Sequence, residues 1–342
     1  MHEYNPIDAS QKEQLVGLIQ EHKLDDFSGG IIDIAQNCVR FAGHSPDSYE
    51  KVGNCRLGGL PDATVSFEWP EEMAFLAQLN MTEIAPFDHN KLLPDSGMLY
   101  FFIGDDESSS DLPMRVIWQD HDIDDLVRIE APPGYKNTKT EYYEGGDPQV
   151  VYSPRQLSLV KSVSLPYIPS RFEKRIFGDT KLSEDQFSQF DKLVLGMHLQ
   201  VESGKVGRHQ LLGYQNLAPY EPDVEACARE FGVDPDLSWI DLDTVNTLIA
   251  ELDKKDESNW SPWYLEHLKE TRRKNREDLI ALGDRRNDFL RAIDDWILLF
   301  EIDSDLNSDI CFWDAGQVHV VIRKQDLLAR NFDKIYAHLF SS

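Results

Sequence analysis

The stretch Gly97-Met98-Leu99-Tyr100-Phe101-Phe102-Ile103 is apolar on both of its alternating faces. Successive side chains of a β-strand point to opposite faces of a sheet, so a continuous apolar run opened by a glycine predicts a central strand covered on both sides. Val65 to Phe67 and Phe75 to Leu79 precede it as short apolar or aromatic runs separated by Pro and Gly, which is typical of strands. The chain between residues 65 and 103 therefore predicts a β-rich body.

The same reasoning extends outward along the chain in both directions. Further strands are expected at Met114 to Trp118, Leu126 to Ile129, Leu157 to Leu165, Trp296 to Ile302 and Val318 to Ile322. Helical spacing of apolar residues, with capping and stop signals, predicts helices over Asp8 to Leu24, from Ser183 to Met197, and over most of residues 221–295. A last amphipathic helix is predicted around Leu327, Leu328, Phe332, Ile335, Tyr336 and Leu339. Strands and helices in this arrangement indicate an α+β protein.

Two parts of the chain carry the same order of features. A glycine turn at Gly58-Gly59, an apolar strand at residues 75–80 and a glycine that opens a second strand at residues 97–103 are followed by a similar series. That second series is Leu212-Gly213, residues 298–303 and residues 316–322. We therefore predict one unit over 1–342 that contains two divergent copies of a β-rich module, 1–170 and 171–342, with a helical insertion at about 221–295 in the second copy.

These residues also carry a resemblance to a known family. Leu57-Gly58-Gly59-Leu60-Pro61, Trp69-Pro70, residues 75–80, Leu93-Pro94 and residues 97–102 resemble the first-half signature of the YwqG-like family, a bacterial family of domains of unknown function. His209 to Tyr214, residues 296–305, Trp313 to Gly316 and Asp326-Leu327 are similar to its later landmarks. The resemblance implies an intracellular α+β protein with mainly antiparallel sheet, and it supplies no catalytic residues.

Charge and composition restrict the classes of partner. With 61 acidic and 34 basic side chains, the formal charge of −27 repels phosphate backbones and anionic membranes, so neither nucleic acid nor a membrane is an expected partner. No run approaches the roughly 20 apolar residues that span a bilayer, and Met1 to Pro6 lacks the features of a signal peptide. The four cysteines show no C-x-x-C spacing. We expect a cytoplasmic protein with reduced thiols, and the sequence leaves its oligomeric state open.

One loop has the spacing of a calcium site. Asp303, Asp305, Asn307 and Asp309 alternate, and Asp314 takes the twelfth place, where a carboxylate closes the shell of oxygen ligands in a calcium loop. Ser308 replaces the glycine of such loops, so a polar hairpin is the competing interpretation. Calcium is the only cofactor that the sequence suggests.

No catalytic residue can be assigned, because the motifs of common nucleophile, phosphate and metalloprotease sites are absent. The preferred hypothesis is a binding protein whose acidic surface engages a basic protein, for example by neutralising a toxin as immunity proteins do. An alternative is a hydrolase with a carboxylate and histidine site built from loops between the two modules. His209 and His319 lie near matching places in the second module, where a histidine beside an apolar strand is more often structural than catalytic. A third is a calcium-binding structural protein.

Overall fold

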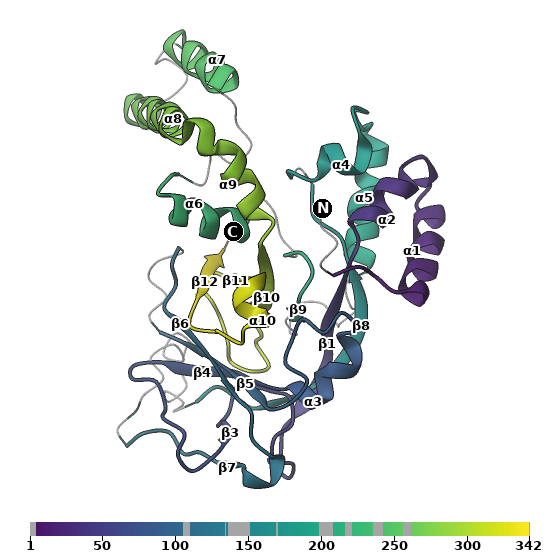
Figure 1. Cartoon of the computed structure of the whole chain (residues 1–342), viewed down its shortest axis with the longest axis vertical. Helices are drawn as coiled ribbons and strands as arrows, with labels where there is room; N and C mark the ends of the chain where they lie inside the picture. Colours follow the sequence, from purple (N-terminus) through teal and green to yellow (C-terminus); the bar gives the residue numbers. More distant parts are fainter. Residues whose placement is uncertain are drawn as a thin grey trace. The chain divides into compact units, whose positions relative to one another are not determined.

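The computed structural model describes residues 5–104, 110–133, 135, 151–168, 170–197, 208–215, 221–234, 242–255 and 261–341. The chain forms two compact units (Figure 1): a larger one from Met1–Tyr220 with Ile297–Ser342, and a smaller one from Glu221–Trp296. Within the described ranges, no helix combines the length and apolar character needed to cross a membrane.

The strands of the larger unit form one large sheet. Its order is β12-β11-β10-β9-β1-β8-β2-β4-β5-β6, and each pairing that the structure describes within it is antiparallel. A separate pair joins β3 to β7. The bounds are β1 (Gln36–Pro46), β2 (Arg56–Leu57), β3 (Asp62–Ala63), β4 (Ala74–Asn80), β5 (Met98–Ile103), β6 (Met114–Gln119), β7 (Val127–Arg128), β8 (Arg155–Ser164), β9 (Gln210–Leu211), β10 (Trp296–Asp303), β11 (Gln317–Arg323) and β12 (Ile335–Phe340). The expected α+β class with antiparallel sheet is confirmed, and all six residues of β5 are buried.

Helices cover one end of the two long strands β1 and β8 (Figure 1). Asp8 and Gln11 form a reciprocal capping box at the start of α1, where the sequence leaves Asp8 and Ser10 open as the cap. Ser183 forms the predicted capping box with Gln186 at the start of α5. The apolar faces of α1 and α5 bury residues such as Leu15 and Phe190 in a core of their own. The helices of the larger unit are α1 (Ala9–Glu21), α2 (Ser28–Ile34), α3 (Met81–Ile84), α4 (Glu173–Phe177), α5 (Glu184–Gly196) and α10 (Lys324–Leu328), with short 3₁₀ turns at Asp25–Phe27, Ala85–Phe87 and Ile123–Asp125.

The centre of the sheet is the pair β1 and β8, which the sequence predicts only in part. β8 corresponds to the alternating run after Leu157, whereas no strand is predicted over β1. Beyond this pair, β1 bonds to β9 and β8 bonds to β2. The strands β9 to β12 of the second half therefore join the rest of the sheet through the N-terminal strand.

Outside this central pair the sheet has two arms: the first arm is β2, β4, β5 and β6, and the second arm is β9, β10, β11 and β12. The two arms use the same registers. In each arm a two-residue strand, followed closely by a glycine, pairs with a longer strand. In the first arm β2 pairs with β4 through Arg56↔Gln78 and Leu57↔Ala77. In the second arm β9 pairs with β10 through Gln210↔Glu301 and Leu211↔Phe300. The next strand then opens at a glycine whose carbonyl accepts a backbone hydrogen bond. Gly97 O accepts from Met81 N at 3.0 Å, and Gly316 O accepts from Ser304 N at 3.0 Å.

Both arms contribute to one hydrophobic core. The rings of Phe101 in β5 and Phe300 in β10 lie 4.6 Å apart between centroids, and both side chains are fully buried. At the far ends of the arms, Leu112 N donates to Ala337 O at 3.0 Å, so the chain just before β6 meets β12 at this point. The sheet thus folds around a shared core.

A buried ionic network lies in the first arm. Arg56 and Asp62 are fully buried and form an ion pair, and Arg56 Nε also lies 2.9 Å from Asp47 Oδ2. Arg128 Nε lies 2.5 Å from Asp62 Oδ1, and Gln78 Nε2 donates to Asp62 Oδ2 at 2.9 Å. Burial by itself would raise the pKa of Asp62, but the hydrogen bond from Arg128 and the charge of Arg56 outweigh it, so the pKa lies below its ordinary value.

The smaller unit is helical. It contains α6 (Pro222–Phe231), α7 (Leu242–Asp253), α8 (Pro262–Leu282), a 3₁₀ turn (Gly283–Arg285) and α9 (Arg286–Ile293). α6 ends at Gly232, which takes the left-handed conformation with φ of 71°, as the predicted stop requires. Cys227 and Phe289 are buried in the core between α6 and α9. The charged face of α8 leaves most of its Arg and Lys side chains partly or fully exposed.

Two predictions about elements are wrong. The C-terminal segment predicted as an amphipathic helix is the short helix α10, a turn and the strand β12. Its apolar spacing mimics a helix, but Arg330 has φ of 59°, which ends the helix, and residues 335–340 then pair with β11. Val65 to Phe67 is a turn rather than a strand, with Val65 86% exposed, because the chain pairs at β3 instead.

Candidate functional site

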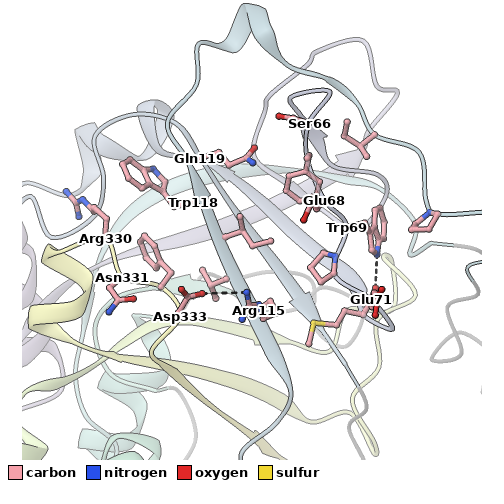
Figure 2. A pocket seen from close by; sticks show the side chains of 18 of the residues that line it. Ser66, Glu68, Trp69, Glu71, Arg115, Trp118, Gln119, Arg330, Asn331 and Asp333 are labelled. Carbon is pink, nitrogen blue, oxygen red and sulfur yellow. Dashed lines mark hydrogen bonds and ion pairs between the residues drawn. The ribbon is translucent and has the colours of Figure 1, made fainter.

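A groove of about 1150 Å³ runs beside β6, the end strand of the sheet. This volume lies slightly above the upper end of the roughly 300–1,000 Å³ of typical ligand pockets. Figure 2 shows β6 with Arg115, Trp118 and Gln119 between two walls. One wall comes from residues 66–73 and 129–132, and the other comes from residues 330–333.

The first wall is an aromatic loop. Trp69 packs edge-on against Phe102 of β5, with 5.4 Å between ring centroids, and against Tyr135 at the same distance. Its indole Nε1 donates to Met73 O at 2.9 Å, so the indole is fixed at both ends. Burial raises the pKa of Tyr135 to about 12, so this phenol stays neutral at physiological pH. The wall is consequently apolar at its base and acidic at its rim, where Glu68 and Glu71 are exposed.

The second wall is the turn that follows α10. Arg330 takes the left-handed conformation and its guanidinium donates to the carbonyl oxygens of Leu92 at 2.8 Å and Leu93 at 3.0 Å. These bonds tie the turn to the body, while Phe332 is buried beneath it. Asp333 Oδ1 lies 3.6 Å from Arg115 Nη2, and both side chains are more than half exposed.

The strand between the walls presents a different face to each. Ile117 belongs with the cluster that contains Trp69 and Ile129, whereas Val116 and Trp118 belong with the main core and Phe332. Trp118 Nε1 donates to Ser96 O at 3.1 Å, which fixes this ring. Each wall therefore covers one face of β6, and the groove opens along the edge of the strand.

The charges of the groove are unbalanced. Its lining carries four carboxylates, Glu68, Glu71, Glu130 and Asp333, and two guanidiniums, Arg115 and Arg330. Arg330 is held by backbone carbonyls and Arg115 lies beside Asp333. Within the described part of the chain, Glu68, Glu71 and Glu130 have no ion-pair partner. The rim of the groove is therefore a site of negative charge open to solvent.

The predicted calcium loop is a tight hairpin centred on Asp305. This residue is fully buried, and its Oδ1 accepts from the backbone N–H of Asn307 at 2.9 Å and of Ser308 at 3.1 Å. Its Oδ2 lies 3.5 Å from His209 Nε2. Asp305 thus uses both carboxylate oxygens within the protein, as an Asp that stabilises a turn does.

The other carboxylates of this loop point to separate neighbours. Asp303 Oδ2 accepts from Arg208 N at 2.9 Å, and burial raises the pKa of Asp303 above its ordinary value. Asp309 accepts from the hydroxyl of Ser153, and Asp314 is exposed. Among the residues that the structure describes, no group of three or more His, Cys, Asp or Glu side chains is placed to hold a metal. Calcium binding by this loop stays a prediction, and calorimetric titration with calcium is its direct test.

His209 and His319, the histidines at matching places in the second module, each lie beside a carboxylate. His209 approaches Asp305, and His319 Nε2 lies 3.4 Å from Glu301 Oε2. All four residues are at most 1% exposed. Acid and base groups do come together in the second arm, but they are buried, and the hydrolase stays a prediction.

No functional role is predicted from the sequence for the residues of the groove. Their signal is the segment Glu68-Trp69-Pro70-Glu71-Glu72, which places an aromatic residue and a proline between acidic residues. A turn of this composition predicts an exposed aromatic wall with a negative rim. Arg115 and Asp333 give no such signal, because 218 positions separate them and only the fold brings them together.

The fold and the groove define an α+β protein with a ten-stranded antiparallel sheet and an acidic groove along its last strand. A family model described as a domain of unknown function, DUF1963, matches residues 55–339, and the chain belongs to this family. The match includes the groove and the sheet outside β1. No curated protein matches the sequence.

Proposed function

We propose that this chain is a binding protein whose groove beside β6 takes a segment of a basic protein partner. The observation that carries the proposal is the set of carboxylates Glu68, Glu71 and Glu130, which have no ion-pair partner among the described residues, around an aromatic wall. Aromatic side chains supply contact area for a partner, and unpaired charge supplies complementarity to lysine and arginine. A neutralised basic toxin is one example of such a partner.

The net charge of the chain supports the same proposal. At −27, the whole molecule attracts positively charged proteins over a distance of about 10 Å at moderate salt. The groove adds local selectivity, because a basic segment that enters it meets carboxylates without displacing an existing strong ion pair. Binding is therefore expected to weaken as the salt concentration rises.

Reversing two charges at the rim tests the proposal. We expect Glu68→Lys with Glu71→Lys to weaken binding of a ten-residue capped peptide of alternating lysine and valine about tenfold, since like charges then face the peptide. Fluorescence anisotropy with a labelled peptide measures the affinity. The matched control is Glu13→Lys with Glu21→Lys on α1, which changes the net charge equally at exposed positions away from the groove.

The control decides between a local site and a general charge effect. If both double variants lose affinity equally, the peptide responds only to net charge and the groove is not the binding site. Both variants should keep the thermal stability of the wild type, because all four glutamates are exposed and have no ion-pair partner in the described chain.

We also infer that the protein is a cytoplasmic, YwqG-like member of its family and that its arms are divergent copies of one module. Two observations support the duplication. The pair β2 and β4 has the same register as the pair β9 and β10. Gly97 and Gly316 each open the next strand and accept a backbone hydrogen bond. A Cβ on Gly97 would lie 2.4 Å from Gln119 O, and one on Gly316 would lie 2.3 Å from Phe340 O. Each glycine therefore permits the same close approach of the next strand.

A further inference from the structure

The edge of β6 carries unused backbone hydrogen-bonding groups in the groove. Gly104 N donates to Pro113 O at 2.7 Å, so residues 113, 115, 117 and 119 turn their backbone groups toward β5. Met114, Val116 and Trp118 must then turn theirs outward, as Leu112 does when it donates to Ala337 of β12. No other described residue hydrogen-bonds to these three outward backbone positions.

The turn before β12 explains why this edge stays open. β12 lies beside the chain at Ser110 and Leu112, but it begins only at Ile335. Before Ile335 the backbone turns away from this line, and Arg330 in that turn takes the left-handed conformation. The guanidinium of Arg330 holds the turn by donating to the carbonyl oxygens of Leu92 and Leu93. The position that a longer β12 would occupy beside Val116 and Trp118 is the groove itself.

From this geometry we infer that the basic partner binds as an extended strand added antiparallel to β6, in line with β12. The inference rests on the proposed function and names its binding mode. Addition of a strand to an exposed edge is a recurring way to recognise extended peptides, because main-chain hydrogen bonds supply affinity and alternate side chains supply specificity. Among the residues that the structure describes, Arg115 with Asp333 is the one ion pair across the groove, and it is exposed and costs little to open.

The two walls predict the sequence pattern of the partner. In an antiparallel pair, residues that exchange hydrogen bonds have side chains on the same face of the sheet. Partner residues bonded to Val116 and Trp118 therefore face Phe332 and the core, where apolar side chains fit. The alternate residues face the Trp69 wall with Glu68 and Glu71, where lysine or arginine fits. The partner segment alternates apolar and basic residues.

Backbone methylation of the lysine and valine peptide tests the binding mode. N-methylation at the valines removes the N–H groups that point to β6, and we expect it to weaken binding about tenfold or more, since several main-chain hydrogen bonds are lost. N-methylation at the lysines removes only N–H groups that point away, so affinity should stay within a few-fold of the unmodified peptide. Equal effects of the two modifications, or the reverse pattern, overturn the inference.

The protein side supplies a second measurement. Val116→Pro removes an outward N–H, which an edge strand tolerates, but it also changes a buried side chain of the core, so Val116→Ala is its matched control. We expect the proline variant to bind the peptide more weakly than the alanine variant. Hydrogen exchange should show new protection of the Met114, Val116 and Trp118 amides in the complex. If these amides gain no protection while the Glu68 and Glu71 variant still loses affinity relative to its control, the groove binds basic segments without strand addition. If that variant and its control bind alike, the proposed function itself fails.

Discussion

Replacing Asp62 by alanine is expected to lower the free energy of unfolding by about 3–5 kcal/mol, because it leaves Arg56 buried without its closest charge. Arg56 and Asp62 have no exposed side-chain surface, so water cannot take the place of the lost carboxylate. Arg128 and Gln78 lose a hydrogen-bond acceptor at the same time. Chemical denaturation followed by circular dichroism measures the loss.

A surface ion pair of the same chemistry is the control. Asp33 pairs with Arg175 at 2.9 Å, and its side chain is 66% exposed, so Asp33→Ala should cost no more than about 1 kcal/mol. Where Asp62→Ala does not fold, Asp62→Asn keeps the shape of the side chain and reports the loss of charge alone. Equal small losses at both positions would show that the buried network does not stabilise the fold.

The same carboxylate makes stability depend on pH. The pKa of Asp62 is lowered in the folded protein, whereas an unfolded aspartate titrates near 3.9. Its contribution is therefore complete above about pH 4 and is lost as the pH falls through the folded pKa. The difference in stability between the wild type and Asp62→Asn should shrink on acidification below about pH 4.

The sequence predicted elements well where local signals agree with the fold. β5 follows from six consecutive apolar residues, and the capping box at Ser183 places the start of α5 correctly. β1 is not predicted from the sequence, because its apolar residues alternate irregularly with the polar residues Asn37 and Arg40. The fold buries these two side chains, and they donate hydrogen bonds to backbone carbonyls far away in the sequence. Such burial depends on partners 50 residues away for Asn37 and 123 residues away for Arg40, which local patterns do not reveal.

The groove was harder to predict than the sheet. It depends on where β12 begins, and the apolar spacing of residues 327–339 favoured a helix that would have removed both the turn and the wall at residues 330–333. The loop from Asp303 to Asp314 has the spacing of calcium ligands, and within it Asp305 Oδ1 accepts hydrogen bonds from the backbone of its own turn. Calcium binding there stays a prediction. Spacing gives the order of ligands along a chain but not the direction of their side chains.

Truncating Phe300 to alanine is expected to cost about 3–5 kcal/mol of stability, since the ring is fully buried and lies between strands from different parts of the chain. It contacts Phe101 of β5 at 4.6 Å between centroids and Phe41 of β1 at 5.7 Å. Phe187→Ala, at a ring that is 41% exposed on α5, is the control and should cost less than about 1.5 kcal/mol.

A double-mutant cycle of Phe101→Ala and Phe300→Ala then asks whether the two arms fold as one. Contacting aromatic rings couple by about 0.5–1.5 kcal/mol beyond their separate burial, so the double variant should lose less stability than the two single losses together. Additive losses, or two separate unfolding transitions, would mean that the arms are independent bodies. A single transition with coupling means that the groove at the end of one arm is supported by the packing of the other, since Phe332 and Val116 belong to this same core.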